Sequence, residues 1–560
     1  MAGSSGPSRL LVIGIDGADP EVLRRWMDQG ELPTLSRLAE QGAWGRLRSA
    51  PNLLSAQAWT DFQCGVNAGK HGIFEFQQRI DHDYDVRAIN SSDRCSRTAW
   101  SLLSEWGRRV AVLNVPLTFP AEPLNGVGIS GFPTPSSDSP GFTYPSQLSE
   151  HITQRHGGYP LEPNYTACMR RGGAHALCRQ LIADMRLKAR VARELLTSED
   201  WDCFVHVISE SDWAAHYLWH THDPAHQRHA EADTQEDLLL EVFRAIDEVL
   251  RSLLAEVTDD MNVLIVSDHG SGPQTYGNNH LRPLLAALGL LHVRRSAVSS
   301  LRDASARLLR GAARLAPRGL IDRIATRPGR VSGHLMRDYM YGPTDWKSTK
   351  AFCFRLPGAG RIFVNLSGRE PAGTVGPSQM DEVTDTITRE LMAARIHDTG
   401  EPAVRHIRRG SELYVGPHAH KALDLIVQWQ EGHVLSGITS PHVGRVDPEF
   451  TGPFHEGRAR TGDHREYGTF LACGPCFAAG AEPDDASLTD IAPTLLHVLG
   501  HPVPEQMDGR VLEEVLSTDF RSAVPVRRCD TPLQTGVREA GYSREEEEQV
   551  KERLADLGYL

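Results

Sequence analysis

The sequence lacks any long apolar run. No stretch reaches the roughly 18 uncharged residues that a helix needs to cross a bilayer. The opening residues, 1–9, contain no apolar segment of the kind found in signal peptides. Nine cysteines are scattered over 560 residues, and an odd, scattered set does not form a disulfide framework. We therefore expect a cytoplasmic protein without a membrane span.

Basic residues are fewer than acidic residues. The chain has 59 Lys and Arg against 72 Asp and Glu, a formal net charge of −13 at pH 7. This balance argues against a nucleic-acid polymer as partner, because a surface that binds a phosphate backbone needs a basic surplus. A small phosphorylated substrate is compatible with it, since bound metal ions reverse the sign of charge locally. The sequence carries no signal for an oligomeric state.

Strand and helix patterns alternate along the chain, which predicts an α/β fold with a mostly parallel sheet covered on both faces. The clearest strand patterns cover residues 10–15, 109–115, 203–208 and 262–266. A chain of 560 residues exceeds what one hydrophobic core usually supports, so we expect an insertion or a second domain.

The predicted organisation has four parts. They are a first part of the catalytic core (9–273), an insertion that forms a lid or cap (274–420), a second part of the core (421–515) and a C-terminal tail (516–560). Residues 294–330 are rich in Arg, Ala and Leu, which predicts helices within the insertion. They form either a solvated helical face or a surface for an anionic substrate. Residues 543–558 predict a charged helix in the tail.

Acids and histidines follow three of the strand patterns directly. Asp16 follows the first, and the pair Asp268-His269 follows the last. Asp212 and His216 come after residues 203–208, and their spacing of four places both on one helix face. The carboxyl ends of parallel strands meet in the crevice where open α/β sheets bind ligands. The sequence therefore predicts that these side chains gather at one metal site.

Each candidate also has a plainer interpretation. Asp16 and Ser55 could be helix caps, and Ser55 could then lie beside a water nucleophile. Asp212 and His216 could be a pair on a helix surface, and Asp268-His269 could be a simple loop. His464 has charged neighbours, as a surface histidine would.

The combination of motifs is more specific than any one of them. In chain order the motifs are Asp16, Ser55-Ala-Gln-Ala-Trp-Thr60, Cys64-Gly-Val-Asn-Ala-Gly-Lys-His-Gly-Ile73, Asp212-x-x-x-His216, Ser267-Asp-His-Gly270 and Gly462-Asp-His-Arg-Glu-Tyr-Gly468. This ordered set, from about residue 9 to 515, resembles the alkaline phosphatase superfamily, and most closely its type I phosphodiesterase/nucleotide pyrophosphatase branch. The resemblance implies a three-layer α/β/α sandwich with a mostly parallel central sheet and a helical insertion.

The resemblance also implies a site with two divalent metal ions. It assigns Asp212, His216 and His464 to one ion, and Asp16, Asp268 and His269 to the other. Aspartate and histidine ligands without thiolates suit Zn²⁺, and Mn²⁺ also fits them.

Ser55 takes the position of the family's nucleophile, where it would also contact an ion. A serine hydroxyl is a poor nucleophile until a base or a metal ion activates it. Asn67 and Lys70 are either phosphate contacts or parts of a structural loop. The pyrophosphatase relatives carry Asn three residues after the nucleophile, where this chain has Ala58. The Cys-x-Pro-x-Arg context of sulfatases is absent around Ser55, which argues against a sulfatase.

The expected function is a metal-dependent phosphohydrolase that cleaves a phosphodiester or nucleotide-pyrophosphate bond through a phosphoserine intermediate. A phosphomonoesterase or a phosphomutase of the same superfamily is the first alternative. A non-catalytic metal-binding protein on this fold is the second, and such a protein would be expected to have lost ligands.

Overall fold

The structure is a computed structural model that describes residues 9–229, 236–294, 340–354, 358–432, 434–449, 460–536, 541–557 and 559. Helices are predicted within residues 294–330, and this range lies outside the described residues except for Arg294. No helix among the described residues has the length and apolar character needed to cross a bilayer.

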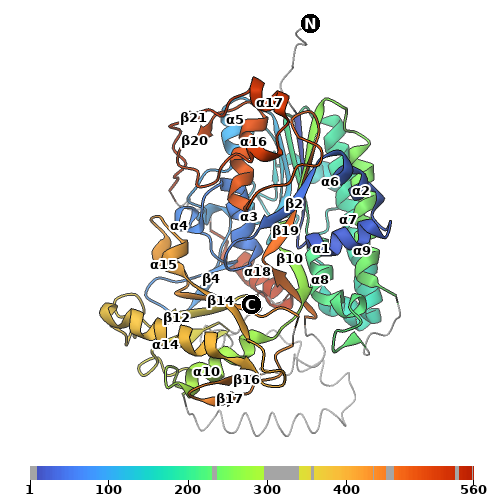
Figure 1. Cartoon of the computed structure of the whole chain (residues 1–560). Helices are drawn as coiled ribbons and strands as arrows, with labels where there is room; N and C mark the ends of the chain where they lie inside the picture. The colour runs from blue at the N-terminus through green and yellow to red at the C-terminus, as the bar shows by residue number, and fades with distance from the viewer. Residues whose placement is uncertain are drawn as a thin grey trace.

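An eight-stranded sheet forms the centre of the molecule, in the order β2-β19-β9-β1-β8-β5-β6-β7 (Figure 1). Its strands are β1 (Arg9–Ile15), β2 (Ala43–Arg48), β5 (Val110–Val115), β6 (Gly126–Ser130), β7 (Thr143–Tyr144), β8 (Cys203–Ile208), β9 (Met261–Val266) and β19 (Tyr467–Cys473). From β9 to β6 the neighbours are parallel, whereas β19 pairs antiparallel with both β9 and β2, and β7 pairs antiparallel with β6. The predicted α/β class is therefore confirmed, with a mixed sheet.

Alternating side chains of the sheet pack into two separate cores, because successive residues of a strand point to opposite faces. Leu10 and Val12 of β1 enter one core, and Leu11 and Ile13 enter the other. One face is covered by α3 (Ser55–Cys64), α5 (Ala99–Glu105) and α16 (Ile491–Val498). The other is covered by α1 (Pro20–Asp28), α2 (Pro33–Gln41), α6 (Gln147–His156), α7 (Tyr165–Ser198), α8 (Glu210–His222) and α9 (Leu238–Leu254). These layers form the expected α/β/α sandwich.

Two smaller antiparallel sheets lie beside this sandwich. One contains β11 (Ala351–Cys353), β12 (Gly360–Val364), β15 (Leu425–Trp429) and β14 (Val404–Arg409), with α14 (Met380–Ala393) in contact with it. The other contains β13 (Arg395–Ile396), β16 (Ile438–Ser440) and β17 (Gly444–Val446).

The sequence predicts that the second part of the core begins at residue 421, and the sheets can be compared with this boundary. Residues up to Val446 belong to the smaller sheets, and the eight-stranded sheet resumes only at Tyr467. The physical reason is that a buried antiparallel strand such as β15 has the same continuous apolar run as a core strand, so the pattern alone does not distinguish them.

A buried ion pair ties α7 to α8. Lys188 Nζ lies 2.9 Å from Glu210 Oε1, and the two side chains are 3% and 1% exposed. Lys188 also donates to the Leu161 carbonyl oxygen and lies 5.4 Å from the ring centre of Trp213. Because Glu210 opens α8, the pair fixes the start of the helix that carries Asp212 and His216.

Replacing Lys188 by Met should destabilise the protein by about 3–5 kcal/mol, because it leaves the Glu210 carboxylate buried without a counter-charge. Urea denaturation would measure the change. The matched control is Arg186→Met on the same helix, which breaks an ion pair to Glu248 whose side chains are 52% and 54% exposed. That variant should lose less than about 1 kcal/mol. Equal losses in the two variants would contradict a stabilising role for the buried pair.

Candidate active site

Three neighbouring parallel strands, β9, β1 and β8, end at the same edge of the sheet. Gly14 of β1 lies opposite Val207 on one side and Val266 on the other, so the chains leave the sheet at one level. Each then places a carboxylate there, from Asp16, Asp212 and Asp268, and all three side chains are buried. The fold therefore concentrates three acids where the sequence predicts them.

Gly17 permits the close approach of these acids. Its φ of 70° lies in the left-handed region, and its N–H donates to Asp268 Oδ1 at 3.2 Å. A Cβ at this position would lie 3.1 Å from Asp212 Oδ1. Glycine is the residue that adopts this conformation and leaves this space at no steric cost.

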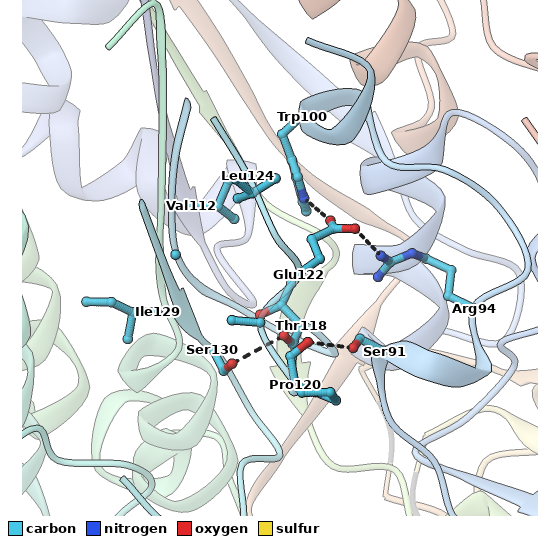
Figure 2. A pocket seen from close by; sticks show the side chains of 12 residues that line it. Ser91, Arg94, Trp100, Val112, Thr118, Pro120, Glu122, Leu124, Ile129 and Ser130 are labelled. Carbon is cyan, nitrogen blue, oxygen red and sulfur yellow. Dashed lines mark hydrogen bonds and ion pairs between the residues drawn. The ribbon is translucent and has the colours of Figure 1, made fainter. Parts of the chain in front are cut away.

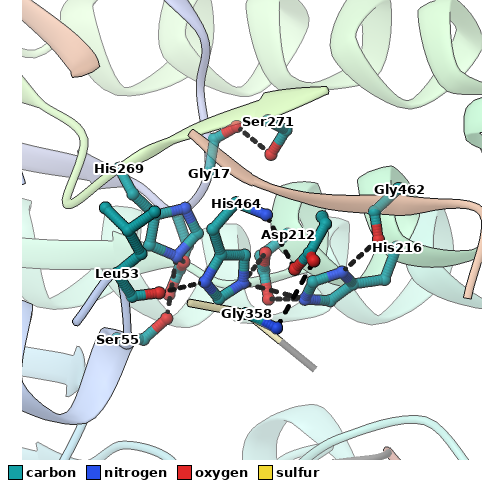
Figure 3. A network of polar contacts seen from close by, with 12 residues as sticks. Gly17, Leu53, Ser55, Asp212, His216, His269, Ser271, Gly358, Gly462 and His464 are labelled. Carbon is teal, nitrogen blue, oxygen red and sulfur yellow. Dashed lines mark hydrogen bonds and ion pairs between the residues drawn. The ribbon is translucent and has the colours of Figure 1, made fainter. Parts of the chain in front are cut away.

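Histidines come to the acids from three directions. His216 lies one helical turn after Asp212, with its Nε2 3.2 Å from Asp212 Oδ2. His464 belongs to β18 (Gly462–Arg465), which pairs with β10 (Gly270–Pro273) just after His269. The rings of His269 and His464 stack with centroids 3.6 Å apart, and His464 Nε2 lies 3.0 Å from His216 Nε2 (Figure 3).

Ser55 lies beside His269. It is the first residue of α3, and its Oγ lies 3.0 Å from His269 Nε2. Two residues earlier, Leu53 has a φ of 55°, a left-handed conformation that is rare for leucine, and its carbonyl oxygen contacts His464 Nδ1. Backbone strain at this turn is thus associated with the orientation of a site histidine.

All three histidines use Nδ1 for a backbone carbonyl. His216 Nδ1 lies 3.1 Å from the Gly462 oxygen and His269 Nδ1 lies 3.0 Å from the Gly270 oxygen, as His464 Nδ1 contacts Leu53. A carbonyl oxygen only accepts, so each Nδ1 carries a proton and each neutral ring presents a lone pair at Nε2. The Nε2 lone pairs of His216 and His464 then lie 3.0 Å apart. Two lone pairs at this distance repel each other unless a positive charge lies between or beside them.

One oxygen of each carboxylate also lacks a donor. Asp16 Oδ1, Asp212 Oδ1 and Asp268 Oδ2 are buried, and the described residues give them no hydrogen-bond partner. A buried carboxylate oxygen without a partner is costly, and a bound cation removes that cost. Two groups, Asp16 with Asp268 and His269, and Asp212 with His269 and His464, have ligand atoms within 4.8 Å of one another. The residues present therefore fit divalent metal ions.

The charges of the three acids are strongly coupled. Burial, together with the neighbouring charge of Asp212, raises the pKa of Asp268 to about 7. Burial and the charge of Asp268 raise the pKa of Asp16 well above its usual value. Burial would raise the pKa of Asp212 as well, but without a cation the protonated forms of His216 and His464 donate from Nε2 and hold that pKa well below its ordinary value. Without a cation the cluster keeps only part of its negative charge.

The structure brings together seven of the predicted site residues, which we call the ligand cluster. They are Asp16, Ser55, Asp212, His216, Asp268, His269 and His464. The plainer interpretations of these residues as surface or loop groups do not agree with their burial, since none is more than 4% exposed. Metal binding by the cluster stays a prediction.

Asn67 and Lys70 lie apart from the ligand cluster. Asn67 caps α4 (Ala68–His71) and donates to Asp508, and Lys70 Nζ contacts the Asp508 carboxylate and the Gln506 carbonyl oxygen. Both follow the C-terminal end of α3, a helix about 15 Å long whose other end carries Ser55. These contacts favour the structural alternative, and a phosphate contact from either residue stays a prediction.

Two further residues contact the cluster acids. Trp59 Nε1 donates to Asp16 Oδ2 at 2.9 Å, and the Tyr559 hydroxyl donates to Asp212 Oδ2 at 2.8 Å. The sequence offers a signal for Trp59, because it stands four residues after Ser55 and therefore on the same helix face. It offers none for Tyr559, which is 347 residues from Asp212.

Comparisons with known proteins identify a family and similar folds. The family described as type I phosphodiesterase / nucleotide pyrophosphatase matches residues 10–435. Among solved structures, phosphonoacetate hydrolase from Sinorhizobium meliloti 1021 with phosphonoformate is similar over 88% of this chain and 96% of its own, at 13% identity and a TM-score of 0.51. Murine ectonucleotide pyrophosphatase / phosphodiesterase 5 in complex with AMP is similar over 91% and 100%, at 11% identity and a TM-score of 0.47. No curated protein matches the chain.

Trp59→Phe should weaken metal binding while the fold is kept. The substitution removes the N–H that orients the Asp16 carboxylate, and partners of this kind typically change metal affinity by about 10–100-fold. Competition for zinc with a coloured chelator would measure the change.

The matched control is Trp100→Phe. Trp100 is also buried and also donates to a carboxylate, Glu122 at 2.6 Å, but in a pocket beside Arg94 outside the ligand cluster (Figure 2). Its loss should lower stability without changing zinc affinity. Equal zinc affinities for Trp59→Phe and Trp100→Phe would show that Trp59 does not orient a metal ligand.

Proposed function

Because the chain belongs to the type I phosphodiesterase / nucleotide pyrophosphatase family, we propose that it cleaves phosphodiester or nucleotide-pyrophosphate bonds through a covalent phosphoserine at Ser55. Membership of this family makes the protein a phosphoester hydrolase of the alkaline phosphatase superfamily. A non-catalytic role is therefore not retained. The finer proposal concerns the intermediate, the metal ions and the kind of ester.

The position of Ser55 is the observation that carries the proposal. Its Oγ lies at the first turn of α3 and 3.0 Å from His269 Nε2, the lone-pair nitrogen of that ring. Unpaired backbone N–H groups at the start of a helix favour an anionic phosphoryl oxygen. A serine presented in this way to a phosphate is placed as a nucleophile would be.

The reaction has two balanced steps. Ser55 Oγ loses its proton and forms a bond to phosphorus, while the bond to the leaving-group oxygen breaks and that oxygen takes the electron pair and one proton, which balances the proton lost by Ser55. A water then loses a proton and bonds to phosphorus, the bond from phosphorus to Oγ breaks, and Oγ takes that electron pair and one proton. The ligand cluster excludes bulk water, because its members are almost fully buried.

We assign Asp212, His216 and His464 to one divalent ion and Asp16, Asp268 and His269 to the other. The lone pairs at Nε2 and the unpartnered carboxylate oxygens support cation binding, and the division between the two ions follows the resemblance, since His269 lies close to both groups of ligand atoms. No thiolate takes part, which suits Zn²⁺, with Mn²⁺ as the alternative. When bound, such ions supply Lewis-acid stabilisation for the charge on the reacting oxygens.

The charges around the ligand cluster favour a diester over a monoester. A monoester carries an additional negative charge, which calls for a lysine or arginine at the non-bridging oxygens. Within the part of the chain that the structure describes, no lysine or arginine forms an ion pair with a cluster side chain. The phosphomonoesterase and phosphomutase alternatives therefore have less support. The cytoplasmic location stays a prediction.

Ser55→Ala should lower kcat by about 1,000-fold or more, because no other group replaces the nucleophile. The zinc content of the purified variant should stay close to that of the parent, since three carboxylates and three histidines remain. Ser130→Ala is the control, because Ser130 is equally buried and donates to the Thr118 carbonyl oxygen away from the cluster. Retained turnover in Ser55→Ala would remove the covalent mechanism.

The kind of ester can be tested with two aryl substrates. The purified protein with zinc should hydrolyse bis-p-nitrophenyl phosphate with a higher kcat/KM than p-nitrophenyl phosphate, because the site offers no additional cation for a dianion. Absorbance of released nitrophenolate measures both rates. A preference for the monoester would favour the phosphomonoesterase alternative instead.

A further inference from the structure

Helix α18 (Arg544–Asp556), Leu557 and Tyr559 lie against the sandwich near the ligand cluster. Glu547 accepts from the Ala88 N–H at 3.2 Å, and Arg553 forms an ion pair of 2.9 Å with the buried Glu162. The helix is therefore attached along its length to elements of the catalytic core. We call the residues from Arg544 to Tyr559 that the structure describes the α18 segment.

The end of the α18 segment is held by Arg460. The Arg460 Nε and Nη2 atoms donate to the Leu557 carbonyl oxygen at 3.2 and 2.6 Å. The guanidinium carbon of Arg460 also lies 4.6 Å from the ring centre of Tyr559, a distance typical of a cation–π contact. Phe76 and Phe132 enclose the same ring, with centroids 5.1 and 5.7 Å away. The Tyr559 side chain is thus fixed on several sides.

This arrangement brings the Tyr559 hydroxyl to one oxygen of Asp212. The hydroxyl donates to Oδ2 at 2.8 Å, and the same oxygen lies 3.2 Å from His216 Nε2. The other oxygen, Oδ1, lies 3.4 Å from His464 Nε2 and has no hydrogen-bond donor among the described residues. The hydrogen bond therefore fixes the rotation of the carboxylate so that Oδ1 is directed into the cluster.

We propose that Tyr559 is a positioning residue that holds the Asp212 carboxylate in the orientation needed to bind a metal ion. The inference rests on the proposed function, because it assumes that Asp212 is a ligand. Hydrogen-bond donors behind a ligating carboxylate fix its geometry and typically change metal affinity by about 10–100-fold. A phenylalanine would fill the same apolar space, so the hydroxyl contributes orientation rather than packing.

The α18 segment also covers one side of the ligand cluster. Ser55 contacts the cluster at His269, whereas Tyr559 contacts it at Asp212 and lies 6.2 Å from the His216 ring. The Tyr559 ring therefore covers the side of the Asp212 and His216 pair. A substrate reaches Ser55 from another side of the cluster.

The test compares Tyr559→Phe with Tyr542→Phe in the full-length chain. Tyr542 precedes the same helix, stacks on Phe119 with centroids 5.7 Å apart and donates its hydroxyl to the Pro133 carbonyl oxygen at 3.0 Å, outside the ligand cluster. Zinc affinity is measured by competition with a coloured chelator, and thermal unfolding reports the fold. Tyr559→Phe should bind one of two zinc ions about 10–100-fold more weakly, with the second ion unchanged. Tyr542→Phe should bind both ions as the parent does.

A kinetic measurement separates positioning from packing. With zinc in large excess, Tyr559→Phe should recover most of the parent kcat, because the weakened ion site is refilled. A loss of kcat that excess zinc does not restore would overturn the inference, since the hydroxyl would then act on something other than ion binding. Equal zinc affinities for Tyr559→Phe and the parent would also overturn it.

Failure of the inference can be distinguished from failure of the proposed function. If the parent binds two zinc ions and Tyr559→Phe binds them equally well, the inference alone fails. If the parent binds fewer than two ions, the assignment of the ligand cluster fails and the inference fails with it. If Ser55→Ala keeps full turnover, the covalent mechanism fails, whereas the zinc comparison still decides the role of Tyr559.

Discussion

Mutual repulsion among three buried carboxylates is the constraint on which this structure depends. Asp16, Asp212 and Asp268 leave adjacent strands at one level, because β9, β1 and β8 are in register, and none of them is more than 3% exposed. Burial alone makes an isolated carboxylate costly, and a second one nearby raises that cost further. The fold does not relieve this repulsion with arginine or lysine ion pairs among the described residues. It places histidine rings beside the acids instead, an arrangement that fits the proposed cations.

Groups outside the ligand cluster fix the orientation of its side chains. Backbone carbonyls of Leu53, Gly270 and Gly462 each fix one histidine ring by its Nδ1. Trp59 and Tyr559 do the same for two of the carboxylates. Metal sites depend on such outer contacts nearly as much as on the ligands themselves. Because these contacts come from separate parts of the chain, the site forms only when the whole sandwich has assembled.

The sequence predicted the local parts of this site well. Asp16, Asp268 and His269 could be recognised because each follows an apolar run, and an acid just after a buried strand lies at the edge of a parallel sheet. Asp212 and His216 could be paired because a spacing of four places them on one helix face. The fold class followed from the alternation of strand and helix patterns.

The parts that the sequence did not predict depend on contacts between distant segments. Tyr559 carries no local signal, since only the docking of α18 brings it to Asp212. The predicted core boundary at residue 421 stays a prediction, and β15, which follows it, has the apolar run of a core strand but pairs within a smaller sheet. Asn67 and Lys70 were candidates because they lie in the Cys64–Ile73 motif, and the length of α3 separates them from Ser55, so a phosphate contact from either stays a prediction.

Charge balance connects the ligand cluster with the substrate. Three ionised carboxylates with two divalent ions, as proposed, leave a single positive charge while Ser55 is neutral. A diester brings one negative charge, which makes the net charge of the site zero. A monoester dianion would leave an excess negative charge, which a low-dielectric site does not tolerate without another cation. The groups that donate to Asp16 and Asp212 from outside the cluster are the aromatic side chains Trp59 and Tyr559. A donor N–H or O–H orients a carboxylate without adding charge. The nearby Arg460 contacts the Tyr559 ring and the Leu557 carbonyl oxygen and, within the described part of the chain, forms no ion pair with a cluster carboxylate.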